Sequence, residues 1–196
     1  MAHISTMEKL GITAPCFSLP NLNAVVKEQT VSLETFEEYP ALLVVFICNH
    51  CPYVVHIRDS FVSFVSEYHE KGLGVVAISS NDVESYPDDS PEQMAEDAVN
   101  YSYPFPYLFD ESQEIAKAYR AACTPDFFLY DRKRTLVYRG QYDSSRPKSS
   151  EPVTGEDLRN ATNALIQNSI IQTEQKPSMG CNIKWKKGGE PDYFAT

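Results

Sequence analysis

Two cysteines in a C-x-x-C arrangement, Cys48 and Cys51, are the residues in this sequence best suited to do chemistry. They follow the most apolar run of the chain, residues 41–47, and Pro52 follows them at the start of a helix-like pattern. A thiol at the start of a helix lies beside unpaired backbone N–H groups and the positive end of the helix dipole, which stabilise a thiolate. A second thiol within reach can close a disulfide. This placement predicts redox chemistry.

Each residue of the motif then has an expected role. We expect Cys48 to be the attacking thiol, with the lower pKa, and Cys51 to be more shielded and to resolve a mixed disulfide. We interpret His50 as a tuning residue, because an imidazole beside a thiolate favours the reduced form. The alternative for His50 is a solvated loop residue.

A zinc site is the other chemistry that a C-x-x-C can support. The sequence has no second C-x-x-C, so zinc would require Cys123 and Cys181 to converge on the pair. We therefore expect no metal. We interpret Cys16 and Cys123 as core residues, with Cys123 as a candidate accessory thiol. Cys181 is either a second-stage resolving thiol on a mobile tail or part of a tail anchored by Trp185.

Composition narrows the choice of partner and compartment. The 196 residues carry a formal net charge of −10, which disfavours binding to nucleic acid. The longest apolar run is far short of the ~20 residues that span a bilayer, so we expect no membrane partner. An odd number of cysteines and an N-terminus without an apolar leader predict a cytoplasmic protein.

Hydrophobic periodicity places these residues on elements. The all-apolar run 41–47 and a second one at 74–78 predict buried strands, joined by a helix from Pro52 to about Gly72, as in a βαβ unit. Further elements are predicted as a helix over 91–101, a strand over 104–109, a helix over 112–122, a hairpin of 126–130 with 135–138, and a final helix opening at 154–157. We expect one domain over 1–196, with an N-terminal extension (about 1–40) and a C-terminal tail (about 177–196).

Four stretches of the sequence carry a family resemblance. They are residues 46–53 around the C-x-x-C, residues 123–129 with a Thr-Pro pair, the opening Ala-Pro-Cys-Phe-Ser-Leu at 14–19, and the tail motif at 180–186. With the order of elements, they resemble the thioredoxin fold in the peroxiredoxin-like branch of the alkyl-hydroperoxide-reductase/thiol-specific-antioxidant (AhpC/TSA) superfamily. The resemblance covers residues ~10–187.

The resemblance implies a fold and a substrate-binding element. The fold would be α/β, a central mixed sheet flanked by helices, with a helical insertion after the βαβ unit. The Thr124-Pro125 bond would be cis, and the backbone of Thr124 would be exposed to an incoming chain for β-type pairing.

The resemblance also implies a thiol–disulfide oxidoreductase without a bound cofactor. Its partners would be a disulfide-bearing protein or small disulfide and a thiol reductant such as thioredoxin or glutathione. One alternative is a thiol peroxidase in which Cys51, at the peroxidatic position, attacks a hydroperoxide and Cys48 or Cys181 resolves it. The Thr/Ser and Pro positions of the peroxidatic pattern hold Cys48 and Val44 here. A module that binds or carries copper through the cysteine pair and His50 is an alternative of another class.

Overall fold

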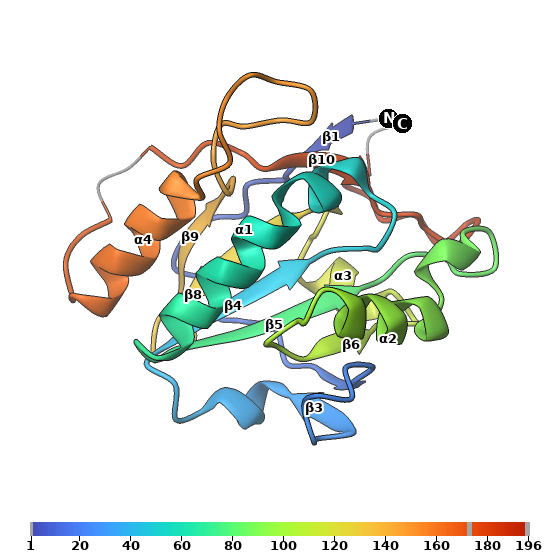
Figure 1. Ribbon diagram of the computed structural model, residues 1–196, viewed down its shortest axis with the longest axis horizontal. Coiled ribbons are helices and arrows are strands. Elements are labelled where there is room, and N and C mark those ends of the chain that lie inside the picture. The colour runs from blue at the N-terminus through green and yellow to red at the C-terminus, as the bar shows by residue number, and fades with distance from the viewer. Residues whose placement is uncertain (1, 172–173, 195–196) are drawn as a thin grey trace.

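A computed structural model describes residues 2–171 and 174–194 (Figure 1). Its main sheet has five strands in the order β6-β5-β4-β8-β9. The strands are β4 (Ala41–Phe46), β5 (Leu73–Ser79), β6 (Tyr107–Phe109), β8 (Asp126–Tyr130) and β9 (Leu136–Gly140). β4, β5 and β6 are parallel, whereas β8 and β9 are antiparallel, so the sheet is mixed as predicted.

The centre of the sheet is the predicted βαβ unit. Every residue of β4 and β5 is buried, which explains why both strands are apolar except for Ser79 at the end of β5. The connecting helix α1 (Pro52–His69) buries one stripe that includes Ile57, Phe61 and Phe64. Gly72, with φ +91°, ends the connection in a conformation that favours glycine.

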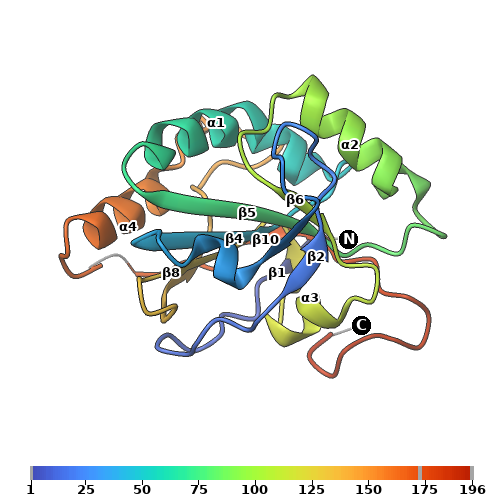
Figure 2. The same ribbon diagram turned by 90° about the horizontal axis from the view of Figure 1, so that it is seen from below.

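Helices cover both faces of the sheet (Figure 2). On one face, α1, α2 (Pro91–Asn100) and α4 (Glu156–Ile166) enclose a core built around the rings of α1. On the other face, α3 (Glu114–Ala118) packs with the N-terminal segments and with Trp185 of the tail. The inserted helix α2 begins as predicted, with Ser90 accepting a hydrogen bond from the Gln93 N–H.

The N-terminal extension forms a small hairpin beside the main sheet. It consists of β2 (Ser18–Pro20) and β3 (Thr30–Ser32), followed by the 3-10 turn η1 (Leu33–Phe36). A second 3-10 turn, η2 (Pro87–Asp89), precedes α2.

A three-stranded sheet that the sequence analysis did not predict joins the two ends of the chain. Its order is β1-β10-β7, with β1 (Ala2–Ile4), β10 (Met179–Asn182) and β7 (Cys123–Thr124). Figure 1 shows β10, near the red end of the colour scale, passing close to the N-terminal end of α1. The C-terminal segment is therefore a paired strand.

Three predictions of element extent or burial are wrong in part. β6 begins only at Tyr107, because Pro104 and Pro106 before it have no backbone N–H to donate to a neighbouring strand. α3 is shorter than 112–122, since Gln113 and Arg120 have positive φ values at its two ends. Cys16 is exposed rather than in the core, because Ala14 and Phe17 are the residues of that segment that turn inward.

Among the described residues, no helix has the length and apolarity that crossing a membrane requires.

Candidate active site

Cys48 and Cys51 lie in the loop that joins β4 to α1. Cys51 is the N-cap residue of α1, and Pro52 occupies the first helical position, where no N–H is needed. The two sulfurs contact the same residue, Thr124: Cys48 Sγ lies 3.4 Å from its Oγ1, and Cys51 Sγ lies 3.0 Å from its carbonyl oxygen. The structure thus brings both predicted thiols against the predicted Thr-Pro loop, and the Thr124-Pro125 bond is cis.

The burial and the pKa of Cys48 differ from what the sequence predicts. Burial of both side chains is nearly complete, at 2 % exposure for Cys48 and 0 % for Cys51. The pKa of Cys48 is raised well above its ordinary value, because it shares its proton with Cys51, is desolvated and faces the negative charge of Asp89. The direction of this shift is opposite to the expectation that Cys48 has the lower pKa of the two.

Cys51 is the thiol that this site favours as a thiolate. Its pKa is held well below the ordinary value, since the thiols of Cys181 and Cys48 lie within hydrogen-bonding reach of its sulfur. The start of α1 adds the positive end of the helix dipole. Burial raises this pKa and opposes the shift without reversing it, whereas the side chain of Thr124 adds to the lowering.

A buried carboxylate, Asp89, lies behind the loop, and no motif of the sequence marked it as a site residue. Its exposure is 0 %. Its oxygens accept hydrogen bonds from the Asn49 backbone N–H (2.8 Å) and the Asn81 amide (2.7 Å). His50 Nδ1 lies 2.7 Å from Asp89 Oδ2, and its ring stacks on Tyr86. His50 therefore lies against the carboxylate that faces Cys48, and its role as a tuning residue stays a prediction.

The side chain and backbone of Asn49 fix the shape of the loop. Tyr107 donates a hydrogen bond from its hydroxyl to Asn49 Oδ1 (2.9 Å), and Arg58 donates one to the Asn49 carbonyl oxygen (3.0 Å). Arg58 is itself held by Asp97 (3.3 Å). A polar residue between the cysteines thus serves to anchor the loop to α1, β6 and α2.

The third thiol at the site is Cys181 on β10. It pairs with Thr124 in the antiparallel register, and Asn182 pairs with Cys123. The prediction that the Thr124 backbone is exposed to an incoming chain is wrong in this structure, because β10 already occupies that edge. Cys181 is half-buried, and its pKa is raised by its interaction with Cys51 and by burial.

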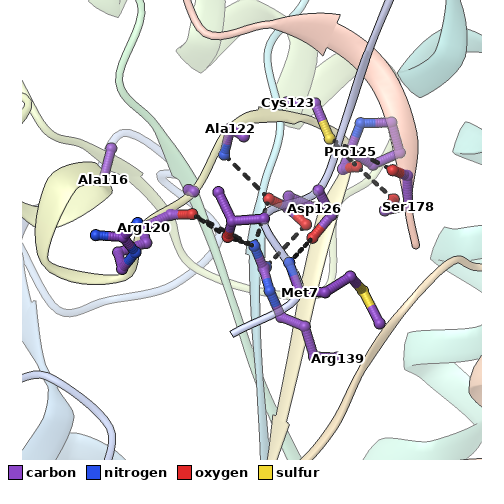
Figure 3. Close-up of polar contacts among 12 residues, drawn as sticks. Met7, Ala116, Arg120, Ala122, Cys123, Pro125, Asp126, Arg139 and Ser178 are labelled. Atoms are coloured by element: carbon purple, nitrogen blue, oxygen red, sulfur yellow. Dashed lines mark hydrogen bonds and ion pairs between the residues drawn. The ribbon is translucent and has the colours of Figure 1, made fainter. Parts of the chain in front are cut away.

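Cys123 is fully buried, and its surroundings do not favour thiol–disulfide exchange. Its sulfur contacts the carbonyl oxygens of Pro125 and Ser178 at 3.6 and 3.9 Å, and burial raises its pKa well above the ordinary value (Figure 3). Below it, Asp126 and Arg139 form a buried ion pair through two hydrogen bonds of 2.8 and 3.1 Å. These contacts fix the Thr-Pro loop to β8 and β9 and favour a structural role for Cys123.

One group of side chains among the described residues has the composition of a metal site. Potential ligand atoms of Cys48, His50 and Asp89 all lie within 4.8 Å of one another. A thiolate, an imidazole and a carboxylate are a donor set that suits zinc, and the first two also suit copper(I). Sequence spacing could not reveal this group, because Asp89 comes from a distant loop.

Comparison with known proteins agrees with this geometry. No curated protein matches the sequence. A solved structure of an uncharacterized conserved protein from Geobacillus kaustophilus is 50% identical, covers 95% of this chain and 97% of its own, and superposes with a TM-score of 0.91. A hypothetical protein from Sinorhizobium meliloti 1021 is 48% identical over 93% of this chain and 98% of its own, with a TM-score of 0.90.

More distant structures share the fold alone. Peroxidoxin BcpB from Mycobacterium tuberculosis is 18% identical, covering 82% of this chain and 97% of its own, with a TM-score of 0.59. The family model for AhpC/TSA matches residues 10–139, which include the C-x-x-C loop, the cis Thr-Pro and the five-stranded sheet almost to its end. The chain therefore belongs to the AhpC/TSA family and has a thioredoxin-like fold.

Proposed function

We propose that the protein is a thiol–disulfide oxidoreductase that cycles Cys48 and Cys51 between dithiol and disulfide. The observation that carries this proposal is that the sulfurs of Cys48 and Cys51, at the start of a helix, both contact Thr124. The pKa of Cys48 is raised and that of Cys51 is lowered. A thiol with a low pKa is a good leaving group, and a neighbour with a high pKa takes up the proton that exchange releases. Family membership supports redox chemistry of this general kind.

The exchange activity can be tested with insulin as the disulfide substrate and dithiothreitol as the reductant. We expect the wild-type protein to accelerate insulin reduction and Cys51→Ser to abolish the acceleration. Cys123→Ser is the matched control, because Cys123 is buried and its sulfur contacts carbonyl oxygens. An unchanged rate in Cys51→Ser would refute the proposal.

A thiol peroxidase is the second candidate, favoured by one observation. Cys51, at the position that resembles the peroxidatic one, is the thiol with the depressed pKa. Stopped-flow oxidation of the reduced protein by hydrogen peroxide and by oxidised glutathione separates the two functions. We expect faster reaction with the disulfide, and a rate with peroxide that is orders of magnitude higher would select the peroxidase.

A metal-binding role is the candidate of another class, favoured by the cluster of Cys48, His50 and Asp89. Titration of the reduced protein with copper(I) or zinc against a chromophoric chelator tests it. Tight binding that is lost in His50→Ala and kept in His69→Ala would support this role. His69 lies at the far end of α1 and provides the control.

A further inference from the structure

Cys181 is the member of the thiol centre that solvent reaches. Cys48 and Cys51 are almost fully buried, whereas Cys181 is partly exposed on β10. A sulfur atom of an external partner therefore cannot contact the C-x-x-C pair unless β10 moves away from the site. Otherwise, the partner must exchange with the C-x-x-C pair through Cys181. The same strand places Cys181 opposite Thr124, the residue that Cys51 contacts, and the two thiols shift each other's pKa.

β10 lies tightly against the Thr-Pro loop. Its register opposite β7 places Cys181 next to Thr124, whose carbonyl oxygen contacts the Cys51 sulfur. Gly180 makes this approach feasible: a Cβ at that position would lie 1.9 Å from the Thr124 carbonyl oxygen. Backbone pairing with β1 on the other side, Ala2 opposite Cys181, further holds the strand in register. The chain thus presents its own cysteine where an extended substrate would pair.

We propose that Cys181 is a third redox thiol, which forms a disulfide with Cys51 and carries exchange between the buried Cys48–Cys51 pair and external thiols. This inference rests on the proposed oxidoreductase function and adds the residue through which partners exchange. Its substrates are small or flexible thiols and disulfides that can approach β10.

The steps balance as thiol–disulfide exchange. Starting from the oxidised pair, the Cys181 sulfur attacks Cys51, the Cys48–Cys51 bond breaks, and the Cys181 proton passes to the released Cys48 thiolate. An external thiolate then attacks the exposed Cys181 sulfur and expels the Cys51 thiolate. A second external thiolate releases Cys181 from the mixed disulfide. Two external thiols are oxidised to one disulfide, and one protein disulfide is reduced.

The environments of the three sulfurs suit this direction of attack. Cys51, with its depressed pKa, is the better leaving group, so an incoming thiolate should attack Cys181 and displace Cys51. Cys48, with its raised pKa, is the natural acceptor for the proton of Cys181. The exposed sulfur is thus the one attacked and the buried sulfur is the one released.

Disulfide mapping tests the link itself. Reduced variants would be oxidised with diamide, quenched in acid, alkylated and analysed by mass spectrometry of peptides. We expect Cys48→Ser to form a Cys51–Cys181 disulfide in high yield and Cys181→Ser to form only Cys48–Cys51. Absence of the Cys51–Cys181 link, with Cys48–Cys51 still forming in the wild type, would overturn this inference and leave the proposed function standing. Absence of both links would overturn both.

Reduction kinetics test whether the link carries exchange. The oxidised protein would be reduced by glutathione under pseudo-first-order conditions, with free thiols followed over time. We expect reduction of Cys181→Ser to be at least about tenfold slower than that of the wild type, since glutathione must then reach a buried sulfur. Cys16→Ser, which removes an exposed thiol outside the site, should match the wild type. Equal rates for Cys181→Ser and the wild type would overturn the proposal.

Discussion

At the scale of single residues, Asp89 contributes through space to the raised pKa of Cys48. Its negative charge is one of the causes that raise this pKa, after proton sharing with Cys51 and burial. We predict that Asp89→Asn lowers the pKa of Cys48, because the neutral amide removes the repulsion of the thiolate. The pH dependence of iodoacetamide labelling, followed on the Cys48 peptide, measures the shift.

The neighbouring carboxylate provides a matched control for that experiment. Asp88 is exposed, and only its backbone carbonyl contacts the loop, so Asp88→Asn should leave the labelling profile of Cys48 unchanged. Equal profiles for Asp89→Asn and the wild type would show that burial and proton sharing account for the whole shift. Circular dichroism would establish that both variants are folded.

His50 is expected to act on the reduction potential through Asp89. The imidazole lies 2.7 Å from the buried carboxylate, so its removal takes one of three partners away from that negative charge beside the thiols. We predict that His50→Ala disfavours the thiolate of the reduced form and lowers the reduction potential, by about 30 mV for each ~1.4 kcal/mol lost. Equilibration with glutathione redox buffers measures it, with His69→Ala as the control. An unchanged potential would mean that Asn49 and the start of α1 alone set the reduction potential.

At the scale of elements, β10 closes the thiol centre. We predict that Gly180→Ala forces the strand away from Thr124, because the added Cβ would overlap the Thr124 carbonyl oxygen. Labelling of Cys51 by iodoacetamide should become faster, and the yield of the Cys51–Cys181 disulfide should fall.

Gly188→Ala is the control for this variant. Gly188 lies in the same tail with nothing within 4 Å of an added Cβ, so the substitution costs only the strain of its positive φ. It should leave Cys51 as slow to react as in the wild type. Fast labelling of Cys51 in both variants would mean that the whole tail, rather than the strand register, protects the site.

The start of α4 depends on a single carboxylate, Asp143. Burial raises its pKa, but hydrogen bonds from Ser145, Gly155 and Thr154 outweigh this and leave the pKa below its ordinary value. Because the folded-state pKa of Asp143 is depressed, the ionised carboxylate stabilises the folded state fully above the unfolded-state pKa. This stabilisation is lost as the pH falls through the folded-state pKa. We predict that Asp143→Asn lowers the free energy of unfolding by about 2 kcal/mol at pH 7.

Urea unfolding at pH 7 and at acidic pH would test the role of Asp143. The deficit of Asp143→Asn relative to the wild type should shrink as the pH falls, since the wild type loses the same charge. Asp59→Asn, on the exposed side of α1, is the control and should behave as the wild type at both pH values. A deficit that is constant with pH would contradict the prediction.

The main sheet and its helices could be predicted from the sequence, whereas the strand over the active site could not. β4 and β5 are apolar except for Ser79 at the end of β5, and α1 carries a regular apolar stripe, so their patterns are unambiguous. β10 reads Met-Gly-Cys-Asn, which has neither alternation nor β-branched residues, and its partners lie at the far end of the sequence. Asp89 was missed for a related reason: its partners Asn49 and His50 belong to the distant C-x-x-C loop.

At the scale of the whole molecule, the chain closes on itself at the active site. β10 lies between β1 and β7, so the N-terminal and C-terminal segments meet beside the thiols. The tail continues from β10 to Ile183 and Trp185, which are buried in the core on the α3 face of the sheet. The anchoring of Trp185 in that core should therefore control access to Cys51 on the other side of β10.

We predict that Trp185→Ala lowers the free energy of unfolding by about 3–5 kcal/mol, as large-to-small core substitutions do, and also opens the thiol centre. Urea unfolding measures the first effect, and the rate of Cys51 labelling under native conditions measures the second. Phe36→Ala is the matched control, because Phe36 is buried in the same core but belongs to η1 rather than to the tail. It should cost similar stability without accelerating the labelling. If both variants accelerate it equally, general loosening of the core exposes Cys51, and the tail is not a separate gate. If only Trp185→Ala does so, the ring of Trp185 is the anchor that keeps Cys181 in place over Cys51.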